Sequence, residues 1–340
     1  MLLWNEACLI NHKKRISENI VKWSRTKDTF LNFISVPYNS TEVFLGVIEE
    51  YARQNENIIY ITNEEIGNID IMTNIKKYTN FTDYCYVKEC KSNLNCKLKI
   101  CNFENAAKLE EKFELVIYDD ISSFSLYNKY EICKLISKLT HKDSKVIIYS
   151  IESIVENSKK LFLPAKDGGL IIEPRTILTR LNMNKEMPFL VYDYLKWSIS
   201  IDKNIIIYVP SERKIDSVAS YVYKYCKSFA KDVVCFAGGE SNKKLIHKFL
   251  QTKNSILITN CFEETTLNSK NSQLIVYFAD DINFTYKEFV YLCGSVGRGE
   301  KDLKGEVILV SNIETEEIEK AKSITSNFNR EAWNMGLLKI

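Results

Sequence analysis

Short apolar runs alternate with amphipathic stretches along the first half of the chain. The apolar residues of 127–140 recur at helical spacing, because Ile132, Leu135, Ile136 and Leu139 share one face. The stretch 41–54 has the same character. The apolar runs predict strands over 30–36, 57–62, 97–103, 113–120 and 144–150. Strands that alternate with helices predict a parallel sheet covered by helices.

The alternation restarts after residue 172. The segment 163–174 contains two of the five prolines and a pair of glycines, which indicates a linker. The second half predicts helices over 212–229 and 313–333, and strands over 204–210, 233–238, 255–259, 273–278 and 305–311. A chain of 340 residues has the length of about two domains. We therefore expect two α/β domains with mainly parallel sheets, at 1–172 and 173–340.

Composition and charge narrow the class of protein. Apolar residues make up 45% of the chain and charged residues 26%, which is typical of a soluble globular protein with a real core. The formal net charge is only +2, so any nucleic-acid binding must use local patches such as 13–15 and 243–244. The chain has no 18-residue apolar run, and its first residues do not resemble a signal peptide. We expect a cytoplasmic protein without a membrane span.

Ten cysteines raise the question of metal or disulfide chemistry. Without a signal peptide, reduced thiols are expected. Cys85, Cys90, Cys96 and Cys101 are spaced C-x4-C-x5-C-x4-C, whereas structural zinc sites use tighter pairs such as C-x2-C. Cys85 and Cys101 also lie in apolar, strand-like runs. We therefore expect no zinc, with a zinc site as the alternative.

The turn after the first strand, 37–42, is where a phosphate loop would lie. Such a loop needs glycines, so that backbone N–H groups approach the phosphates, and a lysine that reaches them. Only Thr41 matches, as the hydroxyl that binds magnesium at the end of the loop. The alternative is an ordinary helix start, with Ser40 as the capping side chain.

Two further features could carry chemistry. Asp119 and Asp120 end the apolar strand 113–120, as in a magnesium-binding acidic motif, although two solvated acids in a turn would have the same sequence. Near the end of the chain, Gly297 and Arg298 follow a helical stretch in the segment GSVGR. Arg298 is either a finger that reaches a γ-phosphate or a surface side chain in a glycine-rich turn.

The order and spacing of these features follow the layout of a superfamily-2 helicase. More closely, the chain resembles the ComFA family, late competence proteins that act as DNA-translocating ATPases in bacterial transformation. FISVPYNSTEVF stands where that family has W-A-V-T-G-A-G-K-T-E, and FELVIYDDISSF matches F-D-L-L-I-I-D-E-V-D-A-F. LPAKDGG resembles the L-P-A-R linker that distinguishes the family from other helicases, and YLCGSVGR matches Q-I-A-G-R-V-G-R.

The resemblance implies two tandem RecA-like domains of the P-loop NTPase type, ATP with Mg²⁺ as cofactor, and single-stranded DNA or another competence protein as partner. It also implies a protein that could reach the inner face of the membrane through its partners. By position, catalysis would fall to Asp119, Asp120 and Arg298. Magnesium would be bound by Thr41 and Asp119. The nucleotide would be contacted by Ser40, Thr41, Glu42, Gly297 and Arg298.

The departures from the family fall on catalytic positions. Ser40 replaces the loop lysine, and Pro37 and Asn39 replace loop glycines. Tyr291 and Ser295 replace the glutamine and first arginine of the final motif. We therefore expect a degenerate helicase-like protein that binds DNA or a partner with little or no ATP hydrolysis. The alternatives are an active DNA-dependent ATPase with substituted motifs, and a scaffold that binds neither ATP nor DNA.

Overall fold

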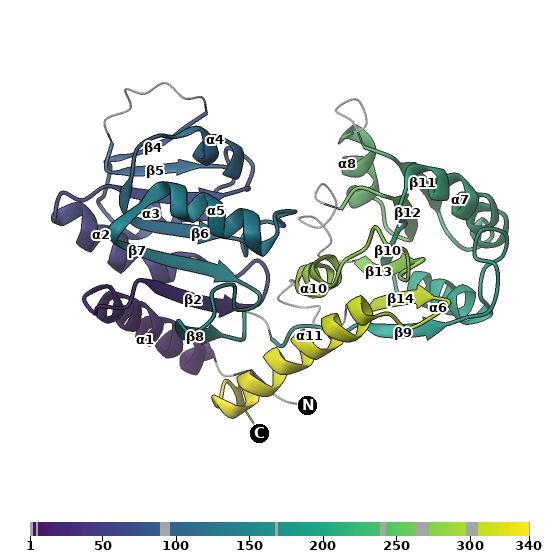
Figure 1. The fold of residues 1–340 in the computed structure, drawn as a ribbon. Coiled ribbons are helices and arrows are strands. Elements are labelled where there is room, and N and C mark those ends of the chain that lie inside the picture. Colours follow the sequence, from purple (N-terminus) through teal and green to yellow (C-terminus); the bar gives the residue numbers. More distant parts are fainter. Residues whose placement is uncertain are drawn as a thin grey trace. The chain divides into compact units, whose positions relative to one another are not determined.

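The computed structural model describes residues 3–4, 6–88, 96–166, 169–238, 243–262, 272–296 and 305–339. The chain divides into two compact units (Figure 1). Unit 1 comprises Met1–Asp167 together with Phe328–Ile340, and unit 2 comprises Gly168–Asn327. The ranges expected from the sequence, 1–172 and 173–340, differ from these units mainly because the C-terminal segment belongs to unit 1.

Unit 1 is built on a seven-stranded sheet with the order β4-β5-β3-β6-β7-β2-β8. Every strand pairing in this sheet is parallel. Its strands are β2 (Phe30–Ser35), β3 (Ile58–Thr62), β4 (Tyr84–Tyr86), β5 (Leu98–Cys101), β6 (Phe113–Asp119), β7 (Thr140–Ser150) and β8 (Lys159–Leu163). The central strands are almost continuously apolar because helices cover both of their faces.

The two faces of this sheet are filled by different helices. The helical elements of unit 1 are α1 (Glu6–Ser24), the 3₁₀ helix η1 (Glu42–Phe44), α2 (Leu45–Arg53), α3 (Asp70–Tyr78), α4 (Phe103–Lys108) and α5 (Lys129–Leu139). The four apolar residues predicted to share a face of 127–140 lie in one buried cluster with Ile59, Val116 and Ile148. Phe44 of η1 packs on the opposite face, against the rings of Tyr60 and Tyr149.

Unit 2 repeats this architecture with a six-stranded parallel sheet of order β11-β12-β10-β13-β14-β9. The strands are β9 (Arg175–Leu178), β10 (Asn204–Tyr208), β11 (Asp232–Phe236), β12 (Ser255–Thr259), β13 (Ser272–Tyr277) and β14 (Val307–Ser311). The helices are α6 (Phe189–Ser200), α7 (Glu212–Cys226), α8 (Lys243–Gln251), α10 (Tyr286–Ser295) and α11 (Glu316–Asn334). The prediction of two α/β domains with mainly parallel sheets is confirmed.

The two ends of the chain meet within unit 1. β1 (Leu3–Trp4) pairs antiparallel with β15 (Leu338–Lys339). The end of α11 also belongs to this unit, where the ring of Phe328 lies 6.3 Å from that of Phe162. Of the helices in the described ranges, none has the length and apolar character needed to cross a membrane.

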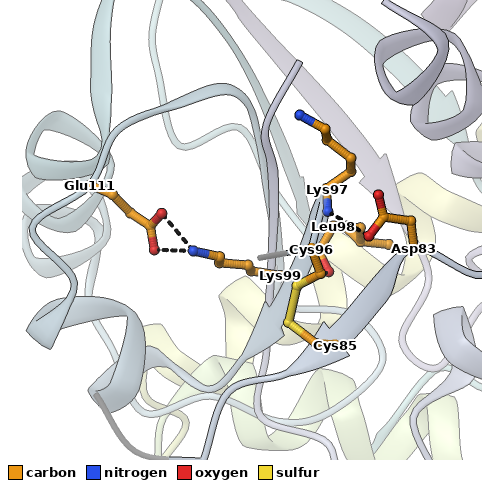
Figure 2. The surroundings of a disulfide bond; sticks show 7 residues. All are labelled: Asp83, Cys85, Cys96, Lys97, Leu98, Lys99 and Glu111. Atoms are coloured by element: carbon orange, nitrogen blue, oxygen red, sulfur yellow. Dashed lines mark hydrogen bonds and ion pairs between the residues drawn. A yellow bond between two sulfur atoms is a disulfide. The ribbon is translucent and has the colours of Figure 1, made fainter. Parts of the chain in front are cut away.

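A disulfide joins Cys85 and Cys96 (Figure 2). The expectation that all the cysteines are reduced thiols is therefore wrong for this pair. β4 and β5 are parallel neighbours, and Cys85 of β4 pairs with Lys99 of β5, three residues after Cys96. The spacing of the two cysteines could not reveal this, because their proximity depends on the strand order. Of the other two cysteines in this cluster, Cys101 is buried and is not part of a disulfide, and Cys90 lies outside the described residues.

Candidate nucleotide site

The candidate site lies at the carboxyl edge of the sheet of unit 1. In a parallel sheet the carboxyl ends of all strands lie at one edge, where α/β proteins bind ligands. The segment 36–41 leaves β2 at this edge, Glu64 follows β3, and Asp119 and Asp120 end β6. The structure thus brings the loop and the acidic pair predicted from the sequence to the same edge.

The loop after β2 is held by its own side chains. The Asn39 Nδ2 atom donates to Ser35 Oγ at 3.0 Å and to the carbonyl oxygen of Ala165 at 2.8 Å. The Asn39 Oδ1 atom accepts the backbone N–H of Ser40 at 3.0 Å. A phosphate loop presents such N–H groups to the nucleotide. Here the Asn39 side chain accepts the N–H group of Ser40, so this donor does not face a ligand.

An internal carboxylate occupies the next two donors. Asp70 Oδ2 accepts both the backbone N–H and the hydroxyl of Thr41, each at 2.8 Å. The same oxygen accepts from Asn74 Nδ2 at 2.9 Å. In a phosphate loop this N–H faces a phosphate and this hydroxyl faces magnesium. The Asp70 carboxylate, an anion carried by α3, therefore stands where an anionic ligand would be needed.

The start of the following helix also differs from the expected cap. Thr41, and not Ser40, is the N-cap residue of η1, and its side chain makes no capping hydrogen bond. Ser40 contributes by accepting the backbone N–H of Glu42 on its Oγ at 3.3 Å. The Glu42 carboxylate pairs with Lys13 Nζ at 3.0 Å. Lys13 is only 8% exposed, so the nucleic-acid patch expected at 13–15 does not include it.

The acidic pair is fully buried. Asp119 and Asp120 are each 1% exposed, so the alternative of two solvated turn residues is wrong. The Oδ1 atom of Asp119 accepts the backbone N–H groups of Ile121 and Ser122 at 2.8 and 2.9 Å. Its Oδ2 atom accepts the hydroxyl of Tyr60 at 2.5 Å. Asp119 thus fixes the turn after β6 and binds β3, which is a structural role.

Burial and mutual repulsion shift the pKa values at this edge. Burial raises the pKa of Asp119, against the effect of its hydrogen bonds. Burial, and then the charge of Asp119, raise the pKa of Glu64 to about 9. The pKa of the Tyr60 hydroxyl also rises well above its usual value, mainly through burial. Glu64 is therefore largely protonated at neutral pH.

The residues at this edge do not fit Mg²⁺ or ATP. The Thr41 hydroxyl donates to Asp70, and both oxygens of Asp119 accept hydrogen bonds from the protein. In the ranges that the structure describes, no group of three or more His, Cys, Asp or Glu side chains could hold a metal ion. A triphosphate would also meet the carboxylates of Asp70 and Asp119 with Ser40 at the lysine position, and like charges at close range disfavour binding.

The second half of the predicted site is only partly described. Gly297 and Arg298 lie outside the described residues. Tyr291 and Ser295, which replace the glutamine and first arginine of the final motif, are both 0% exposed in α10. The Ser295 hydroxyl donates to the carbonyl oxygen of Leu292 at 2.8 Å. These two positions therefore belong to the core of unit 2.

Several residues of this edge were not predicted from the sequence. Glu64 follows a strand in the same way as Asp119, so the rule that found the acidic pair could also have found it. Asp70 and Asn74 lie on a helix that no sequence pattern had indicated. Their role depends on how α3 packs beside the loop, which only the structure provides.

The sequence matches no protein-family model and no curated protein. Three solved structures of low sequence identity share the fold. The chain is similar to a variant of S. cerevisiae Dbp5 bound to RNA and ADP BeF3, with 13% identity over 93% of this chain and 87% of that one, and a TM-score of 0.55. The chain shares the fold of this structure, two tandem RecA-like domains with parallel sheets.

The other two structures agree with this assignment. RecG bound to a three-way DNA junction is 14% identical, with a TM-score of 0.55, over 96% of this chain and 46% of RecG. The DEAD-box helicase Mss116 bound to ssRNA and UDP-BeF is 12% identical, with a TM-score of 0.54, over 92% of this chain and 72% of that one. At these identities the likeness establishes the two RecA-like domains and no activity.

Proposed function

We propose that this chain is a degenerate helicase-like protein of the ComFA type, which binds single-stranded nucleic acid in bacterial DNA uptake and hydrolyses little or no ATP. One observation carries the proposal. Asp70 Oδ2 accepts the two Thr41 donors that a phosphate loop would offer to a phosphate and to magnesium. A nucleotide could use them only after displacing a carboxylate that belongs to the fold.

The charges around the loop predict that ATP hydrolysis is lost and not merely slowed. Phosphoryl transfer depends almost entirely on positioning and on positive charge around the phosphates. Ser40 supplies no charge at the lysine position, and Asp70 adds a negative one. Each ~1.4 kcal/mol of lost transition-state stabilisation lowers the rate about tenfold. Several such losses at one site reduce turnover by many orders of magnitude.

Nucleic-acid binding is supported separately. The similar structures named above hold RNA or a DNA junction, and the resemblance to ComFA points to single-stranded DNA. Backbone contacts of this kind need local rather than global positive charge, which agrees with a net charge of +2. A role in competence, with a further competence protein as partner, follows from the resemblance alone.

Steady-state phosphate release tests the proposed loss of hydrolysis. The purified chain is measured with and without single-stranded DNA, beside an Asp119→Ala control. We expect no turnover that the control lacks. DNA-stimulated turnover above about 1 s⁻¹, the low end of ordinary enzyme rates, that vanishes in the control would overturn the proposal. Thr41 and Asp119 would then be magnesium ligands, with Asp120 on the attacking water and Arg298 as the finger.

Nucleic-acid binding needs its own experiment. Fluorescence anisotropy with a labelled oligonucleotide, at low and at physiological salt, measures it directly. We expect weak binding that decreases steeply with salt, because phosphate contacts release counterions. Absence of binding at low salt would leave a scaffold whose partner is a protein.

A further inference from the structure

A group of lysines and tyrosines lies at the end of α7 in unit 2. The last turn of α7 carries Tyr223, Lys224 and Tyr225, and Lys227 follows directly. Lys224 Nζ lies 5.2 Å from the ring centre of Tyr225, and Lys227 Nζ lies 5.3 Å from that of Tyr223. The end of α7 thus carries two exposed lysine–tyrosine pairs.

Two further exposed lysines, Lys231 and Lys253, lie just before the neighbouring strands β11 and β12. The backbone N–H of Lys231 donates to the carbonyl oxygen of Asn254 at 2.8 Å, so Lys231 lies beside Asn254, the residue that follows Lys253. β11 and β12 pair in parallel from Asp232 and Ser255 onward. Both lysines thus lie at the amino edge of this sheet. We call the two pairs and these two lysines together the α7 ridge, made of Tyr223, Lys224, Tyr225, Lys227, Lys231 and Lys253.

The side chains of the ridge are available to a ligand. The rings of Tyr223 and Tyr225 are 53% and 43% exposed, unlike the many tyrosines of the core. All four lysines are exposed, and within the described parts of the chain none of them forms an ion pair with a carboxylate. The carboxylates near the ridge interact with other residues. Asp232 faces Lys248 Nζ at 3.9 Å, and Asp202 accepts from Asn254 Nδ2 at 3.1 Å.

We propose that the α7 ridge is a binding surface for single-stranded nucleic acid. The lysines meet phosphates, and the exposed tyrosine rings stack on unpaired bases, which is the combination that binds single strands without sequence preference. An acidic protein segment would also match the lysines, and polyglutamate is the probe that separates the two ligands. The inference rests on the proposed nucleic-acid binding and names the surface responsible. The ridge lies at the edge of its sheet opposite to the carboxyl ends of the strands, so it is separate from any nucleotide-binding edge.

The test is anisotropy titration of a labelled oligothymidine with the full chain over a series of salt concentrations. The ridge variant is Lys224→Ala with Lys227→Ala. The matched control, Lys134→Ala with Lys142→Ala, removes the same charge from exposed positions of unit 1. We expect the ridge variant to bind at least tenfold more weakly at low salt, and the control to lose less than threefold. Because each phosphate contact contributes about 0.7 to the salt slope of a single strand, the slope should fall by about 1.4 in the ridge variant only.

A second variant separates stacking from charge. Tyr223→Leu with Tyr225→Leu keeps all four lysines, and we expect it to bind at least fivefold more weakly with an unchanged salt slope. Equal losses in the ridge and control variants would overturn the proposal while leaving nucleic-acid binding itself intact. A lysine variant that unfolds more easily but binds as the wild type does would show that Lys224 and Lys227 only stabilise the end of the helix. No effect of the tyrosines, together with equal affinity for polyglutamate, would make the ridge a general anion surface and contradict the assignment.

Discussion

The carboxyl edge of unit 1 and the α7 ridge of unit 2 use their charges in opposite ways. At the carboxyl edge, Asp119 is buried, and its oxygens are satisfied by backbone N–H groups and by Tyr60. On the ridge, Lys224 and Lys227 are exposed, and each ammonium group lies over a neighbouring tyrosine ring. The polar groups of the carboxyl edge bind other parts of the fold, whereas the lysines of the ridge remain accessible to a partner.

This difference shows how a nucleotide-binding fold can lose its chemistry and keep its architecture. Catalysis on phosphates requires donors that face a ligand. When Asp70 accepts the Thr41 donors, the same geometry becomes a link between η1 and α3. The sheet order and the strand-to-helix connections do not depend on which anion those donors meet. Substitutions in the two regions should therefore have different consequences.

The largest effect is expected from Asp70→Ala. The change leaves the N–H and hydroxyl of Thr41 and the amide of Asn74 without their shared acceptor. Hydrogen bonds to a charged group contribute about 1.5–3 kcal/mol, and unsatisfied buried donors add to the loss. We expect the free energy of unfolding, from urea denaturation, to fall by about 3 kcal/mol.

The matched control for this change is Asp70→Asn. Asparagine keeps one oxygen acceptor, removes the charge and replaces the second oxygen by an NH2 group. The loss of unfolding free energy in Asp70→Asn should therefore be less than half of that in Asp70→Ala. A change below about 0.5 kcal/mol for Asp70→Ala, the range of ordinary surface substitutions, would contradict a structural role for this carboxylate.

Reduction of the Cys85–Cys96 disulfide should have the next largest effect. The bond closes a loop with a sequence separation of 11, and cross-links of this size stabilise a protein by about 2–3 kcal/mol through the unfolded chain. Unfolding with and without dithiothreitol measures the contribution, which should be about 2 kcal/mol. Cys85→Ser, which cannot form the bond, should be insensitive to the reductant. Equal sensitivity of the variant and the wild type would contradict the pairing.

Glu64 should make stability depend on pH. Its pKa is raised in the folded chain, so its stabilising contribution is complete below the unfolded pKa of about 4.3 and is lost as the pH rises towards 9. We expect Glu64→Gln to match the wild type near pH 5 and to exceed it by about 1 kcal/mol at pH 9, a value that allows for partial exposure. Parallel curves for the two proteins between pH 5 and 9 would show that Glu64 ionises freely in the folded state.

The smallest effect on stability is expected at the α7 ridge. Lys224→Ala with Lys227→Ala removes exposed charges that have no carboxylate partner in the described structure, and such changes usually alter stability by less than about 0.5 kcal/mol. Thermal unfolding should therefore give the same midpoint as the wild type within a few degrees. A loss of stability as large as that of Asp70→Ala would show that the ridge lysines, like Asp70, hold the fold together.

The sequence predicted the fold well because the fold depends on local patterns. The strand runs and the helix 127–140 were recognisable from periodicity, and their alternation implies parallel sheets. Asp119 was predicted as a site residue because it ends an apolar, strand-like run of the sequence. Asp70 could not be found, since its carboxylate reaches Thr41 across 29 positions of the chain, and α3 had no recognised pattern. The Cys85–Cys96 bond was missed for the same reason, because it depends on which strands are neighbours.

Equilibrium binding of a fluorescent, non-hydrolysable ATP analogue in the presence of Mg²⁺ tests the central claim most directly. The claim is that Asp70 already occupies the donors of Thr41 that a nucleotide would need. We predict no saturable binding to the wild type up to about 1 mM analogue, the upper end of ordinary Michaelis constants. Saturable, magnesium-dependent binding at micromolar concentrations, abolished by Thr41→Val, would contradict it.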